Sequence, residues 1–214
     1  MEVAIDFEDF SQWETVYEPS SDTFFLCDGI SAVAADFPAV SVIAEIGCGS
    51  GYVSIYTAKL LRSLGKVGIH FATDINIDCC NLAQKISQDN RVIIAPIRDF
   101  FVSSLRQVDV LIFNPPYVET PKEELEEAQQ TKGIAASWAG GEDGADVVYE
   151  CLQFLLDNRQ KFSEEFRFVL LLSRVNKPKK MARWCSKRGL QMKTVLEKNC
   201  QGESLLIVLV TFQK

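Results

Sequence analysis

Histidine is almost absent from this chain of 214 residues, and its scarcity limits the chemistry that the protein can perform. The single histidine, His70, lies in the apolar, strand-like stretch 68–73, where a buried structural role is more common than catalysis. A histidine that activates a nucleophile must lie in a polar site. Zinc sites are usually built from several histidines or cysteines. We therefore expect neither a catalytic triad nor a metal site.

Cysteine pairs with the spacing of metal or redox sites are also missing. The seven cysteines are scattered, without a Cys-x-x-Cys pair. The acidic first twenty residues have neither the basic start nor the apolar core of a signal peptide, and no apolar run is long enough to span a membrane. These absences predict a cytoplasmic protein with reduced thiols, the nucleus being a second compartment to consider.

Basic residues are outnumbered, with 22 lysines and arginines against 29 aspartates and glutamates and a net charge of −7. Such a balance repels a phosphate backbone, so a nucleic-acid partner is disfavoured. The one basic stretch, 177–188, has the spacing of a solvated helix face.

Apolar residues make up 47% of the chain, and they alternate between strand-like and helix-like runs. A helix capped by Ser20 or Ser21 is predicted to continue to Ala34. Predicted strands follow at 40–46, 68–73, 91–95, 108–113 and 167–172, and predicted helices at 52–64, 78–88, 147–156 and from Asn176 and Pro178 to Arg188. Segments 191–196 and 205–212 flank a turn at 199–202 and predict a closing antiparallel pair.

This order predicts an α/β fold with an open, mostly parallel, doubly wound sheet of about seven strands and an antiparallel C-terminal strand pair. We interpret residues 1–214 as one domain, with an N-terminal lid and helix in 1–40. Segment 118–143 is rich in Pro, Glu, Gln, Gly and Thr and is too long for an ordinary connection, so we expect a functional or mobile loop there, which would bind the substrate.

A glycine-rich turn, Glu45 to Gly51, joins the first predicted strand of the alternation to its helix. Counting from Gly47, a dinucleotide-binding fingerprint would need a third glycine where Tyr52 stands. The spacing is instead Gly-x-Gly-x-Gly (Gly47, Gly49 and Gly51) preceded by Glu45, which resembles motif I of S-adenosylmethionine methyltransferases. A tight strand-to-helix turn without a ligand is the alternative.

Acidic residues stand at or just past the ends of the next two predicted strands of the parallel sheet. Asp74 ends one strand, where its carboxylate could accept both hydroxyls of a ribose; capping the following helix is the alternative. Asp99 and Phe100 follow the next strand, where Asp99 could accept the exocyclic amine of an adenine and Phe100 could cover its ring.

Asn114-Pro115-Pro116-Tyr117 directly follows the strand at 108–113, so it lies at the same edge of the sheet as the glycine turn. An amide or exocyclic amino nitrogen is a poor nucleophile until acceptors hold its two hydrogens. The Asn114 side-chain oxygen and the Pro115 carbonyl could supply those acceptors and aim the nitrogen at a methyl donor, while Tyr117 covers the planar group. A simple proline turn is the alternative.

The combined set of motifs resembles the HemK/PrmC family of methyltransferases, and in particular its short eukaryotic and archaeal branch. The residues that carry the resemblance are Tyr17-Glu18-Pro19, Asp22-Thr23, Glu45 to Gly51, Asp74-Ile75-Asn76, Asp99, Asn114 to Tyr117 and Trp138-Ala139-Gly140-Gly141. The resemblance implies a Rossmann-like class I fold, S-adenosylmethionine as cofactor and S-adenosylhomocysteine as product. It also implies that the acceptor is N5 of the glutamine in the Gly-Gly-Gln motif of a class 1 translation release factor.

The resemblance further implies how the site is completed. Tyr17, Pro19, Asp22 and Thr23 would close over the pocket, Ile75 and Asn114 would join the cofactor-binding residues, and the helical domain that precedes the catalytic domain in bacterial relatives is not expected here. The short branch is similar to enzymes that act as heterodimers with a small zinc-binding activator, which docks along an edge strand; we place it on Arg91 to Ala95. Poor solubility of the isolated chain is then expected.

Two other acceptors remain open at this stage. An adenine-N6 DNA methyltransferase can use the same four-residue motif, but it would have to extract a base and bind phosphates, and this chain has neither a recognition domain nor a basic surface. Protein lysine methylation is also compatible with such a pocket. A domain that only binds the nucleoside is disfavoured because Asn114 and the glycine turn are both present.

Overall fold

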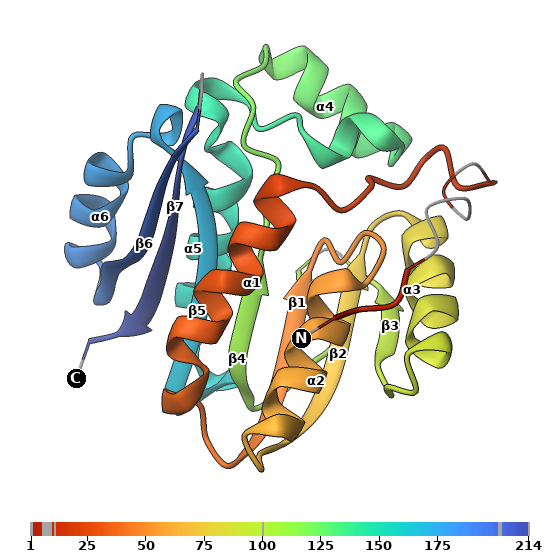
Figure 1. The fold of residues 1–214 in the computed structure, drawn as a ribbon. Coiled ribbons are helices and arrows are strands. Elements are labelled where there is room, and N and C mark those ends of the chain that lie inside the picture. The colour runs from red at the N-terminus through yellow and green to blue at the C-terminus, as the bar shows by residue number, and fades with distance from the viewer. Residues whose placement is uncertain (1, 6–9, 11, 100, 201–202, 214) are drawn as a thin grey trace.

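The computed structural model describes the whole chain except residues 1, 6–9, 11, 100, 201–202 and 214. The described residues form a seven-stranded sheet in the order β3-β2-β1-β4-β5-β7-β6, with helices on both faces (Figure 1). The strands are β1 (Val40–Ile46), β2 (Val67–Asp74), β3 (Ala95–Arg98), β4 (Val108–Phe113), β5 (Phe162–Ser173), β6 (Leu190–Cys200) and β7 (Glu203–Phe212). The α-helices are α1 (Ser21–Val33), α2 (Tyr52–Ser63), α3 (Ile77–Asp89), α4 (Lys122–Thr131), α5 (Asp146–Asp157) and α6 (Pro178–Ser186).

Five neighbouring strands of the sheet are parallel, and β7 and β6 complete it as an antiparallel pair. β1 pairs in parallel with β2 and β4, β2 with β3, and β4 with β5, whereas β7 is antiparallel to both β5 and β6. The predicted mostly parallel sheet with an antiparallel C-terminal pair is confirmed. Parallel strands end at a common edge, so the segments that follow β1, β2, β3 and β4 meet there.

The core lies in two layers on either side of the sheet. Helices α1 and α2 pack on one face against inward residues such as Ile43, Val110 and Val169, and α3 extends this layer. Helices α5 and α6 pack on the other face against Leu111 and Phe168. Because the central strands are covered on both sides, apolar residues on both of their faces are buried, and no strict alternation of apolar and polar residues is needed. None of the helices in the described part of the chain is long and apolar enough to cross a membrane.

The position of the edge strand differs from the sequence prediction of 91–95. Helix α3 ends in a turn in which Arg91 has a φ of 53° and the Val92 N–H donates to the Ser87 carbonyl. Sheet pairing with β2 starts only at Ala95, opposite Phe71. The apolar residues 92–94 precede the strand. Ile94 is buried against α2 and α3, and Ile93 is 92% exposed. The edge strand is therefore 95–98.

Two further expectations need correction. Segment 118–143 is not only a loop, because it contains α4, which buries Leu125 and Ala128 and exposes a row of glutamates. Asn176 does not cap α6: the N-cap is Lys177, with a φ of 51°, and Asn176 ends the short 3-10 helix Arg174–Asn176. The predicted turn at 199–202 lies partly outside the described residues.

Candidate active site

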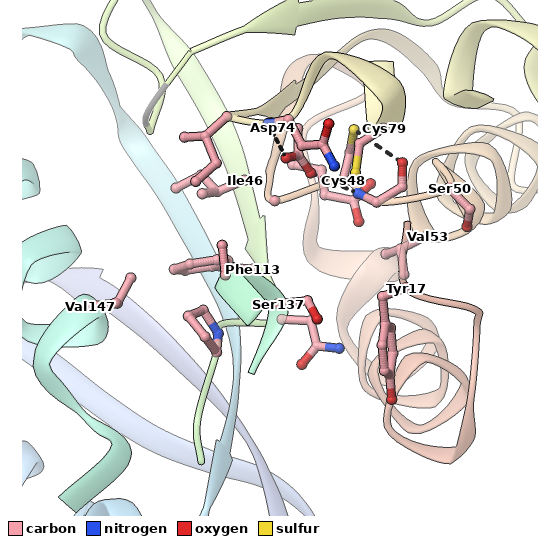
Figure 2. A pocket seen from close by; sticks show the side chains of 18 of the residues that line it. Tyr17, Ile46, Cys48, Ser50, Val53, Asp74, Cys79, Phe113, Ser137 and Val147 are labelled. Carbon is pink, nitrogen blue, oxygen red and sulfur yellow. Dashed lines mark hydrogen bonds between the residues drawn. The ribbon is translucent and has the colours of Figure 1, made fainter. Parts of the chain in front are cut away.

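One cavity lies at the edge where β1, β2, β3 and β4 end, and it brings together most of the residues singled out from the sequence. Figure 2 shows residues of its walls: Cys48 and Ser50 come from the glycine turn, and Tyr17, Asp74, Phe113 and Ser137 come from other segments. The predicted site residues that line it are Tyr17, Pro19, Asp22, Thr23, Glu45, Gly47, Gly49, Asp74, Ile75, Asp99, Asn114 and Pro116. Gly51, Pro115 and Tyr117 support these walls without lining the cavity, and Phe100 lies outside the described residues.

The glycine turn depends on backbone angles that other residues adopt with strain. Gly47, Gly49 and Gly51 have φ values of 61°, 51° and 79°. A Cβ on Gly51 would also lie 2.7 Å from the Cβ of Ala83, because α2 begins there in close contact with α3. The glycines thus bring the turn's backbone into the cavity wall.

Glu45 is a buried carboxyl at the end of β1. It accepts a hydrogen bond from the Ser54 hydroxyl of α2. Burial raises the pKa of Glu45 to about 8, although the Ser54 hydrogen bonds act in the opposite direction. A cationic group in the cavity would favour the ionised form of this carboxyl.

Asp74 fixes the turn from the neighbouring strand. Its Oδ2 accepts a hydrogen bond of 3.0 Å from the Gly49 N–H and its Oδ1 one of 2.9 Å from the Asn76 N–H. Burial nevertheless raises its pKa above the usual range. The helix-cap alternative for Asp74 does not apply, since the N-cap of α3 is Asn76, whose side chain accepts from the Asp78 N–H.

Asp99 lies at the β3 end of the cavity. Its carboxylate accepts hydrogen bonds from the hydroxyls of Ser103 and Ser104, which hold the turn after β3. Phe101, which the sequence did not single out, lines the cavity nearby with a φ of 62°. His70 is buried in β2 away from the cavity lining, and the described residues contain no cluster suited to a metal ion.

The contact between Asn114 and Asp22 fixes the direction of the Asn114 amide. Asn114 Nδ2 donates a hydrogen bond of 2.9 Å to Asp22 Oδ2. An ionised carboxylate only accepts, so the amide nitrogen faces Asp22 and the oxygen faces the other way. Asn114 Oδ1 is buried and has no hydrogen-bond partner among the described residues. A buried acceptor at the cavity wall is thereby left for a donor from a ligand.

Asp22 is the centre of a polar network that joins the N-terminal segment to the Asn-Pro-Pro-Tyr turn. Ser20, the N-cap of α1, donates to Asp22 over 2.7 Å, and the Tyr17 and Tyr117 hydroxyls donate to it over 3.4 Å. Burial and the charge of Asp22 raise the pKa of both tyrosines, so their hydroxyls stay protonated and can donate. The N-terminal segment is thus tied to Asn114.

Asn176, which the sequence assigned only to the start of a helix, holds the Asn-Pro-Pro-Tyr turn from behind. Asn176 is buried, and its Nδ2 donates to the carbonyls of Tyr117, Asp143 and Gly144, while its Oδ1 accepts from the Ser173 N–H. These carbonyls are 32 to 59 positions away, and no local pattern marks such contacts.

The Trp-Ala-Gly-Gly stretch packs beside the same turn. The Val118 N–H donates to the Trp138 carbonyl over 3.0 Å, and the Gly140 N–H donates to the Val118 carbonyl over 2.9 Å. A Cβ on Gly140 would lie 2.8 Å from the Pro116 carbonyl oxygen, so only glycine allows this close approach. The stretch and the turn form one unit.

A mostly parallel seven-stranded sheet with a glycine turn and Asn-Pro-Pro-Tyr at its carboxyl edge defines a class I, Rossmann-like methyltransferase. The family model for the methyltransferase small domain matches residues 29–137. Methyltransferase HEMK2 of Mus musculus is 34% identical over 198 residues, which cover 90% of this chain and 88% of that protein. With this match, the chain belongs to the methyltransferase small domain family, in the eukaryotic HemK branch.

Two further comparisons agree with this assignment. The eRF1 methyltransferase catalytic subunit mtq2 of Schizosaccharomyces pombe is 31% identical over 213 residues, which cover 92% of this chain and 89% of that protein. The fold also matches the solved structure of the E. cuniculi Mtq2-Trm112 complex, with a TM-score of 0.65, 22% identity, and coverage of 94% of this chain and 99% of that chain.

Proposed function

We propose that this protein transfers a methyl group from S-adenosylmethionine to N5 of the glutamine in the Gly-Gly-Gln motif of a class 1 translation release factor. The observation that carries the proposal is the buried Oδ1 of Asn114, which has no hydrogen-bond partner among the described residues and is turned away from Asp22 at the cavity wall. The names of the relatives support it, since one is an eRF1 methyltransferase catalytic subunit. The reaction takes place in the cytoplasm, with the nucleus as a second compartment.

The residues around the cavity suit the methyl donor, which supplies an electrophilic methyl group on a sulfonium. Glu45 would meet the cationic methionine end, the glycine turn would let the backbone approach, and Asp74 would hold the ribose hydroxyls. Asp99 would accept the adenine amine. The order of the strands supports this assignment, because Asp99 follows β3, Asp74 ends β2 and Asn114 follows β4.

Asn114 orients the acceptor nitrogen. A primary amide delocalises its nitrogen lone pair, and two acceptors that hold both N–H groups orient that nitrogen toward the methyl group. Asn114 Oδ1 serves as one acceptor, and the Pro115 carbonyl is the predicted second. These hydrogen bonds strengthen as positive charge develops on nitrogen. The methylated nitrogen then loses a proton to solvent, so the mechanism uses no histidine.

We propose that the enzyme acts with a small zinc-binding activator subunit, which docks along β3, the edge strand of the sheet. The connection from β3 to β4 contains no helix in its described residues, and nearby apolar side chains lack cover. Ile93, Ile69 and Val67 are 92%, 56% and 60% exposed. Isolated apolar residues are common on surfaces, but this group adjoins an open strand edge that a partner strand could extend. The solved Mtq2-Trm112 complex, whose Mtq2 chain has the same fold, supports a partner of this kind.

Lysine is the second candidate acceptor, favoured by one observation. Burial and the charge of Asp22 raise the pKa of Glu203, at the start of β7, and the charges of Asp22 and Glu203 both contribute to the raised pKa values of Tyr17 and Tyr117. This acidic pair beside Tyr17 and Tyr117 could attract an ammonium group. The same acidity opposes an adenine in DNA, whose phosphates it would repel.

The test is a methylation assay with labelled S-adenosylmethionine and the activator. Wild type and Asn114→Ala are compared on a release factor with the Gly-Gly-Gln motif, the same factor with Gly-Gly-Ala, a lysine peptide and duplex DNA. We expect wild type to label only the Gly-Gly-Gln factor, and Asn114→Ala to lose at least about 100-fold in rate. Label in the lysine peptide alone would transfer the assignment to the second candidate, and label in DNA alone would refute both.

A further inference from the structure

Gln129 on α4 carries another buried polar atom that has no hydrogen-bond partner among the described residues. Its Nε2 is buried, and no hydrogen-bond acceptor among the described residues faces it. Leaving a buried amide donor unpaired costs about 1–3 kcal/mol, so such groups usually have a partner. Gln129 belongs to the wall of the main cavity, and a ligand there can supply the missing acceptor.

The position of Gln129 identifies which end of the cavity it serves. It also lines an adjoining cavity together with Ile75, Arg98, Asp99 and Lys132. Arg98 and Asp99 come from the end of β3, two strands away from β1 and three from β4 in the sheet. Gln129 therefore faces the Asp99 end of the cleft, far from the Asn114 end where methyl transfer occurs. Figure 1 shows α4 above the edge toward which the parallel strands run.

Three described side chains, those of Ile75, Asp99 and Gln129, line both cavities, and Gln129 alone of these three carries a hydrogen-bond donor, whereas Arg98 and Lys132 line only the adjoining cavity. The Arg98 guanidinium donates through Nε to the Ile75 carbonyl over 3.1 Å, and the Asp99 carboxylate can only accept. An adenine presents both kinds of group: an exocyclic amine that donates, flanked by the ring nitrogens N1 and N7 that accept. Asp99 can take the amine, and a ring nitrogen beside it then needs a donor.

We propose that Gln129 recognises the adenine of the methyl donor by donating a hydrogen bond from Nε2 to one of the two ring nitrogens that flank the exocyclic amine, N1 or N7. This inference rests on the proposed use of S-adenosylmethionine and adds a specificity-determining residue to that site. It also gives α4 a function: the helix forms the wall against the nucleobase, so the segment expected to bind substrate is part of the donor site as well.

The test is calorimetric titration of the full chain, bound to its activator, with S-adenosylhomocysteine and with its 1-deaza and 7-deaza analogues. Each analogue lacks one of the two ring acceptors. Gln129→Met removes the amide at similar length. The matched control is Gln130→Met, because Gln130 is the exposed neighbour on the same helix.

In wild type, we expect one of the two analogues to bind about 5- to 10-fold more weakly than S-adenosylhomocysteine, the loss expected for one hydrogen bond. In Gln129→Met that difference should vanish, while Gln130→Met should keep it. The inference would be overturned if Gln129→Met bound S-adenosylhomocysteine with the affinity of wild type. It would also be overturned if the variant lost the same factor in affinity for all three ligands, because that result indicates a role in helix stability. If wild type bound none of the ligands, the proposed donor itself would be wrong.

Discussion

Asp22 and Asn114 lie 92 positions apart in the chain, and their contact decides which atom of the Asn114 amide faces the cavity. An asparagine amide can rotate by 180° and exchange its oxygen and nitrogen at little cost, because the two ends have similar shape. A neighbouring group that can only accept hydrogen bonds prevents this exchange. The carboxylate removes that freedom. A residue of the N-terminal segment thus acts on catalysis through Asn114, as a positioning residue.

Asp22→Asn tests this dependence. An amide at position 22 can donate as well as accept, so Asn114 could present either its oxygen or its nitrogen to the substrate. We expect kcat to fall about 10- to 100-fold with a smaller change in KM. Asp28→Asn, at an exposed position of the same helix, should leave kcat unchanged. Steady-state kinetics with saturating activator measure kcat and KM of both variants. A wild-type kcat in Asp22→Asn would contradict the positioning role of Asp22.

Glu45 predicts a pH dependence of donor binding. Its pKa of about 8 in the free chain lies well above the usual value of 4.5, so the carboxyl is largely protonated at pH 6 and ionised above pH 8. A cationic methionine end favours the ionised form. Affinity for S-adenosylhomocysteine should therefore rise as pH increases from 6 to 8, with proton release on binding. Calorimetry in buffers of different ionisation enthalpy measures both quantities.

Two variants make the Glu45 prediction specific. Glu45→Gln should bind more weakly and without the pH-dependent rise, since it cannot ionise. Ser54→Ala removes a hydrogen bond that lowers the pKa of Glu45, so the rise should move to higher pH. An unchanged pH profile in both variants would show that another group controls binding.

Elements far apart in sequence meet behind the Asn-Pro-Pro-Tyr turn, where Asn176 joins the end of β5 to residues 117, 143 and 144. Asn176→Ala leaves buried carbonyls unpaired at a cost of about 1–3 kcal/mol, which lowers Tm by roughly 2–10 °C. We also expect kcat to fall, because the Tyr117 backbone loses its support. Thermal melts and kinetics measure the two effects.

Asn158→Ala is the control for Asn176. Its side chain also donates to a backbone carbonyl, that of Phe154, but at the far end of α5. This variant should lose some stability and keep its kcat once folded. If Asn176→Ala lost stability alone, Asn176 would have no positioning role.

The exposed apolar group beside β3 predicts the docking site of the activator. Ile93→Lys changes a side chain that is 92% exposed, so the fold should be unaffected, and a charge there should oppose burial against a partner. We expect loss of co-purification with the activator and better solubility of the isolated chain. Val175→Lys, at a 51% exposed position away from β3, should do neither. A complex of unchanged stability in Ile93→Lys would move the interface elsewhere.

The elements that can be predicted from the sequence are those whose signal is local. β1 and β4 have the predicted bounds, because each is a mainly apolar run inside the parallel sheet. The predicted position of β3 is wrong, since Ile93 and Ile94 have the same apolar signal although they lie outside the sheet. Helix α4 escapes prediction because only Leu125 and Ala128 of its residues are buried, and its many charges hide the helical period.

At the scale of the whole molecule, the parallel order of the strands explains why so much of the candidate site can be predicted. Residues that follow successive parallel strands meet at one edge, so Glu45, Asp74 and Asn114 line a common cavity. Contacts across the fold cannot be inferred in this way. Asp22 with Asn114, Asn176 with the Tyr117 carbonyl, and Gln129 beside Asp99 each depend on how distant segments pack.

The central claim is that the free oxygen of Asn114 holds the amide of the substrate glutamine. The most direct measurement is a crystal structure of the complex with the activator, S-adenosylhomocysteine and a peptide containing Gly-Gly-Gln. We predict that the glutamine nitrogen lies about 3 Å from Asn114 Oδ1, with Asn114 Nδ2 still bound to Asp22. A glutamine bound elsewhere, or an Asn114 side chain directed away from the nucleoside, would contradict the account.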